Sequence, residues 1–177
     1  MKPIGPLMHE HRLIERMIAV IAKGKDAMAR NRKVDAVFID SAVDFIRTYA
    51  DKTHHGKEED ILFRDLAKKK MNVQHTRIMQ ELLDEHVFAR KMTGELVAAK
   101  ESWLAGDTKS IDVVLDRITT LVNFYPEHIR KEDKEFFFPI LDYLTKDEQD
   151  RMLAEFYDFD RQMIHLKYRW VVEGFEK

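Results

Sequence analysis

The chain has 177 residues, of which 35% are charged and 45% hydrophobic, with only 6 Gly and 4 Pro, a balance that suits one compact domain of long amphipathic helices. A net charge of −2 gives no overall field that would attract nucleic acid or an anionic membrane. The absence of cysteine excludes disulfides, iron–sulfur clusters, thiolate zinc sites and cysteine nucleophiles, so any metal must be held by histidine and carboxylate.

The first two helices are predicted by apolar residues that recur every three or four positions, the pattern of a helix buried along one face. One such stripe covers residues 7–21, and the polar stretch 23–33, which contains Gly24, is expected to carry the turn that follows. A second stripe covers residues 37–66 and is expected to end at the basic stretch 68–70. These stripes predict two antiparallel neighbours.

Two more helices follow the same pattern. A third stripe covers residues 78–97 and leads to a turn at 104–107, which contains a Gly-Asp pair. A fourth begins at residue 111 and is expected to stop at Pro139, because proline cannot continue a helix. Short connections between four long helices favour an up-down-up-down arrangement.

A fifth helix is predicted after the fourth. Thr145 and Glu148 form a capping-box sequence, which marks the start of an amphipathic segment. The predicted fold is therefore all-α: an up-down-up-down four-helix bundle over about 7–140, with an additional C-terminal helix over about 145–174. We expect one domain over residues 1–177, because no low-complexity linker interrupts the chain.

Two ten-residue segments, 54–63 and 128–137, repeat one another. The matched positions are His54 with His128, Lys57 with Lys131, Glu58 with Glu132, Glu59 with Asp133 and Phe63 with Phe137. The shared element is His-x-x-x-Glu, whose spacing of four puts an imidazole and a carboxylate on the same helix face. The repeat indicates pseudo-symmetric halves that flank two metal ions.

Four histidines are expected to meet at one level of the bundle. Antiparallel neighbours align residues that lie equally far from the turn that joins them. His11 and His54 each lie roughly 20 residues from the first predicted turn, His54 and His86 roughly 15 from the second, and His86 and His128 roughly 20 from the third. One histidine per helix therefore shares a common height.

The predicted metal ligands are His11, His54, Glu58, His86, His128 and Glu132. Neutral imidazoles with a few carboxylates suit iron, manganese or zinc better than calcium or magnesium, which prefer oxygen ligands. If both carboxylates bridge, each metal has two imidazoles and two protein oxygens. A bridging solvent oxygen would then leave a free position for O2, NO or peroxide on an octahedral ion.

One alternative pair of ligands stays open at this point, and three histidines are set aside. His55 with Glu59 has the same spacing as His54 with Glu58, although His54 points nearer the apolar stripe. The histidines assigned to the surface or to ordinary core are His9, His75 and His165.

Two tyrosines precede the repeated histidines by about one helical turn. Tyr49 lies before His54 and Tyr125 before His128. A phenol in either position could donate a hydrogen bond to a bound oxygen species, and the alternative is that both rings fill core.

The set His11, His54-x-x-x-Glu58, His86 and His128-x-x-x-Glu132 resembles the hemerythrin-like, HHE cation-binding domains over roughly residues 7–140. The segments Glu-Glu-Asp-Ile-Leu-Phe and Lys-Glu-Asp-Lys-Glu-Phe-Phe-Phe-Pro are also similar to that family. The resemblance implies two non-haem iron ions, joined by an oxo or hydroxo bridge, inside a four-helix bundle.

One position departs from the oxygen-carrying hemerythrins. Those proteins place a second histidine one turn beyond the first on the third helix, where this chain has Arg90. With one imidazole fewer, a more open and more carboxylate-rich site is expected, which favours sensing, peroxide or NO chemistry, or iron handling over reversible O2 carriage. Those carriers also use an aspartate at the position of Asp133, but the internal repeat ranks Glu132 ahead of it.

The expected function is that of a cytoplasmic non-haem di-iron protein that binds O2, NO or related small oxidants for sensing, storage or protection. The alternatives are a di-iron enzyme that consumes peroxide or nitric oxide, and an iron-storage or iron-homeostasis protein. Membrane is not expected as a partner, because no apolar run is long enough to span a bilayer. Nucleic acid is not expected either, because the net charge is only −2. The aromatic residues expected to cover the bundle or to form a homodimer contact are Tyr168, Trp170 and Phe175.

Overall fold

The computed structural model describes residues 2–175, with the side chains of Ile164, Tyr168, Trp170 and 171–175 outside that description. The predicted covering or dimer-forming role of Tyr168, Trp170 and Phe175 therefore falls on side chains outside the described residues. Within the described part of the chain, no helix is both long and apolar enough to cross a membrane.

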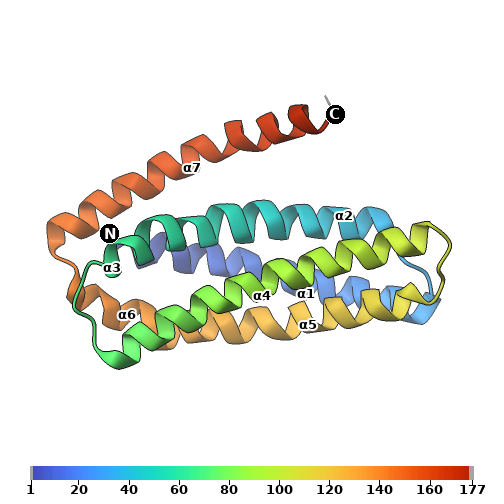
Figure 1. Ribbon diagram of the computed structural model, residues 1–177, viewed down its shortest axis with the longest axis horizontal. Helices are drawn as coiled ribbons and strands as arrows, with labels where there is room; N and C mark the ends of the chain where they lie inside the picture. Colours follow the sequence, from blue (N-terminus) through green and yellow to red (C-terminus); the bar gives the residue numbers. More distant parts are fainter. Residues whose placement is uncertain (1, 176–177) are drawn as a thin grey trace.

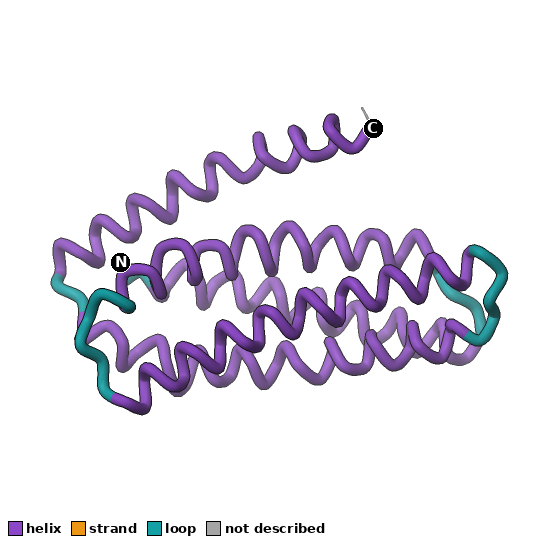
Figure 2. The backbone as a smooth tube through the Cα atoms, viewed as in Figure 1, coloured by secondary structure: helices purple, strands orange, loops and turns teal. Residues whose placement is uncertain are grey.

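Four long helical rods run antiparallel to one another and form the bundle (Figure 1). The first rod is α1 (Ile4–Asn31). The second joins α2 (Ala36–Phe45), η1 (Ile46–His55), η2 (Glu58–Phe63) and α3 (Arg64–Leu66). The third is α4 (Val73–Leu104), and the fourth joins α5 (Ser110–Lys131), η3 (Glu132–Phe136) and α6 (Phe137–Ile140). The connections gather at the two ends of the bundle (Figure 2), and the predicted all-α bundle is confirmed.

The last helix, α7 (Lys146–Phe175), follows the short 3-10 turn η4 (Leu141–Tyr143). The predicted capping box forms, because the Thr145 amide donates to Glu148 Oε2 at 2.8 Å and the Glu148 amide to Thr145 Oγ1 at 3.3 Å. The helix contacts η1 and η2 and then diverges from the bundle towards the C-terminus (Figure 1). It therefore lies over the segment that carries His54 and Glu58.

The first turn lies at the end of the polar stretch 23–33 that is expected to carry it. Helix α1 passes through Gly24 and ends at Asn31, and Arg32 closes it in the left-handed conformation with a φ of 48°. Gly24 is needed for packing instead, because a β-carbon there would overlap the ring of Phe38 on α2. The predicted stop at Pro139 holds, since α6 ends one residue beyond it.

Two apolar cores fill the bundle, one towards each end. Ile14 and Ala89 belong to the first, whereas Leu7 and Leu82 belong to the second. His11 and His86 lie in the sequence between these pairs, as do the other predicted ligands on their own rods. The bundle therefore contains a buried polar layer between two apolar layers.

Parts of two rods are wider than an α-helix. Residues Ile46–His55, Glu58–Phe63 and Glu132–Phe136 are π-helical, so each turn contains more residues than an α-turn. Both copies of the sequence repeat contain such a segment. Because π-helical segments occur frequently at functional sites, the polar layer is the first place to look for chemistry.

Candidate metal centre

The structure brings the six predicted residues together in the polar layer, where all of them are buried. They are His11 on α1, His54 on η1, Glu58 on η2, His86 on α4, His128 on α5 and Glu132 on η3. The four histidines that were expected at one level of the bundle, from their distances to the turns, therefore do lie in one layer. The three histidines that were set aside lie elsewhere: His9 and His165 are exposed, and His75 is 2.9 Å from the phenol of Tyr143.

Each of the two buried glutamates lies between histidines of different helices. Glu58 places one carboxylate oxygen 3.4 Å from Nε2 of His54 and the other 3.4 Å from Nε2 of His86. Glu132 places one oxygen 3.1 Å from Nε2 of His11 and the other 3.4 Å from Nε2 of His128. Donors held at ~2.1 Å and at right angles around one ion are about 3 Å apart, so these spacings are close to those of a coordination sphere. Each carboxylate therefore has one oxygen near a histidine of the His11 and His54 pair and the other near a histidine of the His86 and His128 pair.

A seventh residue, His55, joins the cluster. It is 1% exposed, and its ring centroid lies 3.8 Å from that of His86 and 5.6 Å from that of His128. The donor atoms form two groups, each within 4.8 Å, namely His55 with His86 and His128, and His11 with His54, Glu58 and Glu132. The expected deficit of one imidazole is therefore absent from the geometry, because His55 brings in a fifth imidazole from the second rod while Arg90 stays outside.

The widened helix explains why both His54 and His55 face the centre. In an α-helix, neighbouring side chains diverge, so only one of two successive residues points along a given direction. A π-helical turn contains more residues, which reduces the angle between successive side chains. The prediction from sequence made the two histidines alternatives, because it used the period of an α-helix for this segment. The adjacent His-His pair was the available signal.

All five buried imidazoles have a carboxylate next to Nδ1. The pairs are His11 with Asp133 at 2.8 Å, His54 with Glu10 at 2.9 Å, His55 with Asp51 at 3.4 Å, His86 with Glu59 at 2.7 Å and His128 with Glu85 at 2.7 Å. A carboxylate that accepts from Nδ1 selects the tautomer whose Nε2 lone pair is free for a metal. Glu59 and Asp133, the alternative ligands considered from sequence, hold histidines in place from outside the centre.

Every one of these outer carboxylates is bonded to a basic side chain. The pairs are Asp133 with Arg12, Glu10 with Lys57, Asp51 and Glu59 with Arg90, and Glu85 with Lys131. Four basic side chains offset part of the charge of the five outer acids, and Glu58 and Glu132 add two more carboxylates at the centre. Two cations at the centre would neutralise that charge.

Several central atoms have no hydrogen-bond partner among the residues that the structure describes. They are both carboxylate oxygens of Glu58, both of Glu132, and Nε2 of His86 and of His128. Buried polar atoms without partners are costly, and carboxylates are rarely buried unless they are paired or bind metal. These unpaired oxygen and nitrogen atoms face one another, an arrangement that fits a pair of metal ions.

Electrostatics in the layer point the same way. Burial and the negative charge of Glu132 raise the pKa of Glu58 well above its ordinary value. Burial and the neighbouring charge of His11 lower the pKa of His54 to about 4. For His11, burial opposes protonation, but hydrogen bonds to Asp133 and Glu132 outweigh it and raise the pKa to about 9. Without metal, protons must share the space between these groups.

Comparison with known families identifies the chain. The model of the hemerythrin HHE cation-binding domain matches residues 2–141, which contain the whole polar layer. The chain belongs to the hemerythrin HHE family. The suspected resemblance is thereby confirmed, and with it the coarse function of a metal-binding domain. The description of the family as a cation-binding domain agrees with a cluster of histidines and glutamates that could hold a metal.

Curated relatives of this hemerythrin-family chain add little about its role. Proteins of Mycobacterium tuberculosis and Mycobacterium bovis, each described as uncharacterized, are 22% identical over 152 residues, or 86% of this chain. The chain spans 58% of the length of these relatives. No solved structure gives a significant match.

The two tyrosines predicted near the histidines have different surroundings. Tyr125 is buried, and its phenol oxygen has no hydrogen-bond partner among the described residues. Tyr49 is half-buried and stacks on Phe45, with ring centroids 5.1 Å apart. Only Tyr125 therefore has a buried donor without an acceptor.

Proposed function

We propose that this chain holds two iron ions between Glu58 and Glu132 and binds a small oxidant, such as O2, NO or peroxide, at that pair. The observation that carries the proposal is the division of the potential ligand atoms into two groups, together with the position of each glutamate, whose two oxygens lie 3.1–3.4 Å from histidine nitrogens of both groups. Imidazole and carboxylate donors suit iron, and the family is one of cation-binding domains.

The donor counts of the two metal positions are unequal, which supports small-molecule chemistry. One position has three imidazoles, from His55, His86 and His128, and the other has two, from His11 and His54. If each glutamate gives one oxygen to each ion, the second ion has one protein donor fewer. An octahedral ion there has more room for an exogenous ligand. A pair of irons supplies redox chemistry towards such a ligand.

The chain's own residues hold and orient the imidazoles and exclude water. The outer carboxylates set the tautomer of each histidine, and the apolar cores on both sides keep the layer dry. Phe137 stacks on His11 with ring centroids 5.6 Å apart, and Phe124 stacks on His128 at 5.2 Å. These rings limit how far the imidazoles can turn.

Metal analysis and the optical spectrum of the purified protein test the proposal. We expect about two irons per chain and the near-ultraviolet absorption of a bridged ferric pair, both lost in His54→Ala and His128→Ala. His75→Ala is the matched control and should retain both. A protein that binds no iron after anaerobic incubation with Fe(II), yet is folded, would refute the proposal.

The ligand is then tested on the iron-loaded protein. A stable spectral adduct with O2 or NO would support a sensing, storage or protective role. Steady consumption of peroxide or NO, lost in the same two variants, would favour the enzyme instead. Ready exchange of iron without either behaviour would favour iron storage.

A further inference from the structure

A cavity of about 360 Å³ lies beside the metal centre, between the second, third and fourth rods. Its walls include Ile46, Asp51, His55, Ala89, Thr93 and Tyr125, and Arg47 and Arg90 lie at its rim. His55 is the residue that the cavity and the metal cluster share. Nothing in the proposed metal chemistry accounts for this space.

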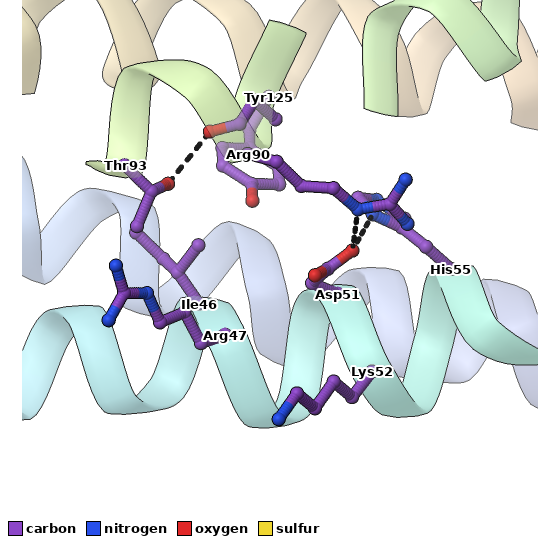
Figure 3. Close-up of a pocket in the computed structure, with 9 residues that line it drawn as sticks. Ile46, Arg47, Asp51, Lys52, His55, Arg90, Thr93 and Tyr125 are labelled. Carbon is purple, nitrogen blue, oxygen red and sulfur yellow. Dashed lines mark hydrogen bonds and ion pairs between the residues drawn. The ribbon is translucent and has the colours of Figure 1, made fainter. Parts of the chain in front are cut away.

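Tyr125 places an unpaired donor in the cavity. Its side chain is 1% exposed, its phenol oxygen has no partner among the described residues, and Figure 3 shows that oxygen pointing into the open space. The nearby hydroxyl of Thr93 donates to the backbone oxygen of Ala89 at 2.8 Å and is not within hydrogen-bond reach of the Tyr125 phenol. A buried hydroxyl without a partner costs free energy, so an occupant of the cavity that accepts a hydrogen bond from Tyr125 would be stabilised there.

The charged groups around the cavity favour an acceptor that is negative. Asp51 is the acid in its wall, and Nε of Arg90 already bonds to it at 2.7 Å. Arg47 lies on the opposite side in Figure 3 and has no ion-pair or hydrogen-bond partner among the residues that the structure describes. The rim therefore has positive charge that the chain itself does not balance.

We infer that this cavity is a binding site for a small monoanion, for which formate is the probe, with the Tyr125 phenol as the buried hydrogen-bond donor and the Arg47 guanidinium as the positive charge at the rim. Both groups donate hydrogen bonds to the anion, and the apolar side chains of Ile46 and Ala89 close the inner wall. The site goes beyond the proposed function, because its two donors are not metal ligands. An anion held there lies beside His55, which also belongs to the metal cluster.

Isothermal titration calorimetry with sodium formate tests the inference on the protein as purified, at an ionic strength kept constant with sodium chloride. We expect saturable binding to the wild type. Tyr125→Phe and Arg47→Gln should each weaken it by roughly tenfold, since each removes one hydrogen bond to a charged group. Ala89→Leu, which extends the inner wall into the cavity, should weaken it as well. Tyr49→Phe and Arg77→Gln are the matched controls and should bind formate like the wild type.

The outcomes separate this inference from the proposed function, because iron content is measured on the same samples. Formate binding that survives Tyr125→Phe, Arg47→Gln and Ala89→Leu, as direct binding to iron would, overturns the anion site. So does a wild type that binds two irons but no formate. A wild type without iron whose formate binding needs Tyr125 and Arg47 supports the anion site and refutes only the di-iron proposal. Arg47 is exposed, so its variant decides the matter even if Tyr125→Phe fails to fold.

Discussion

At the scale of single residues, His55 is the least expected member of the cluster that could hold a metal. It completes a group of three imidazoles with His86 and His128, and its Nδ1 faces Asp51 at 3.4 Å. A chain with Arg90 in place of the third-helix histidine of the oxygen carriers thus recovers a fifth imidazole from the second rod. The number of imidazoles is retained although their positions differ.

Removal of His55 should therefore reduce the iron content. We predict that His55→Ala binds about one iron per chain instead of two, because one position loses one of its three imidazoles while the other keeps His11 and His54. Metal analysis and the near-ultraviolet spectrum measure this loss. Two irons and an unchanged spectrum in the variant would show that His55 is only a core residue.

The outer carboxylates should matter almost as much as the ligands. Glu85 accepts from Nδ1 of His128 at 2.7 Å, so we predict that Glu85→Gln lowers iron affinity by roughly 10–100-fold. Competition with a chelator measures the affinity. Glu81 on the same helix contacts Lys131 at 3.4 Å but contacts none of the imidazoles, so Glu81→Gln is the matched control. Equal affinities of the two variants would contradict the orienting role.

The sequence predicted six of the seven clustered residues, because the repeated His-x-x-x-Glu and the distances to the turns depend only on helix geometry. The choice of Glu132 over Asp133 came from the same repeat, and Asp133 indeed contacts His11 from outside. The inward direction of His55 depends on local widening of the helix, which no periodic pattern of apolar residues reveals. Outer carboxylates were missed for another reason: exposed and site-facing acids look alike in sequence.

At the scale of elements, α7 is held against the second rod by buried contacts. Lys57 is fully buried and bonds to Asp160 of α7 at 2.7 Å and to Glu10 of α1. Gly56 lies directly under Phe159, so that a β-carbon would be 2.8 Å from its Cζ atom. The helix therefore covers the segment between His54 and Glu58.

Two glycines should respond in opposite directions to alanine. Gly56→Ala is predicted to destabilise the fold by about 1–3 kcal/mol, because the added methyl must displace Phe159. Gly94→Ala in α4 is predicted to stabilise it by about 0.5–1 kcal/mol, because a β-carbon there has open space and alanine favours the helix. Urea unfolding of both variants measures the difference. The same sign for both would contradict the packing of α7.

The start of α7 should depend on pH through Glu148. Hydrogen bonds from Lys69 and the Thr145 backbone lower the pKa of Glu148 to about 2 in the folded chain. A lowered pKa stabilises the fold above the unfolded value of about 4.5, and the contribution is lost as the pH falls towards 2. We predict that Glu148→Gln lowers the urea midpoint at pH 7 and that this deficit shrinks steadily below pH 4.5. A deficit independent of pH would contradict the assignment.

The four rods and the capping box of α7 were predictable because apolar spacing and capping residues are local signals. The first turn lies within the expected stretch 23–33, but Gly24 is not part of it, because that residue is helical and contacts Phe38 of another helix. Such a contact is tertiary and leaves no trace in local sequence. The same limit applies to Gly56 and Phe159.

At the scale of the whole molecule, the bundle contains two apolar cores separated by a charged layer. The cores belong to different ends of the same rods, and the layer between them contains the carboxylate oxygens of Glu58 and Glu132 and Nε2 of His86 and His128, which have no hydrogen-bond partner among the described residues. Metal ions would convert this unfavourable layer into a crosslink between all four rods, because the ligands come from every one of them. Metal binding at this layer would thus hold the four rods of the molecule together.

The most direct test of this claim is a crystal structure of the iron-loaded protein with an anomalous difference map collected at the iron edge. We predict two iron peaks with Glu58 and Glu132 between them. One iron is coordinated by His11 and His54, and the other by His55, His86 and His128. A single peak, a peak outside this layer, or a map without peaks from protein that contains iron would contradict it.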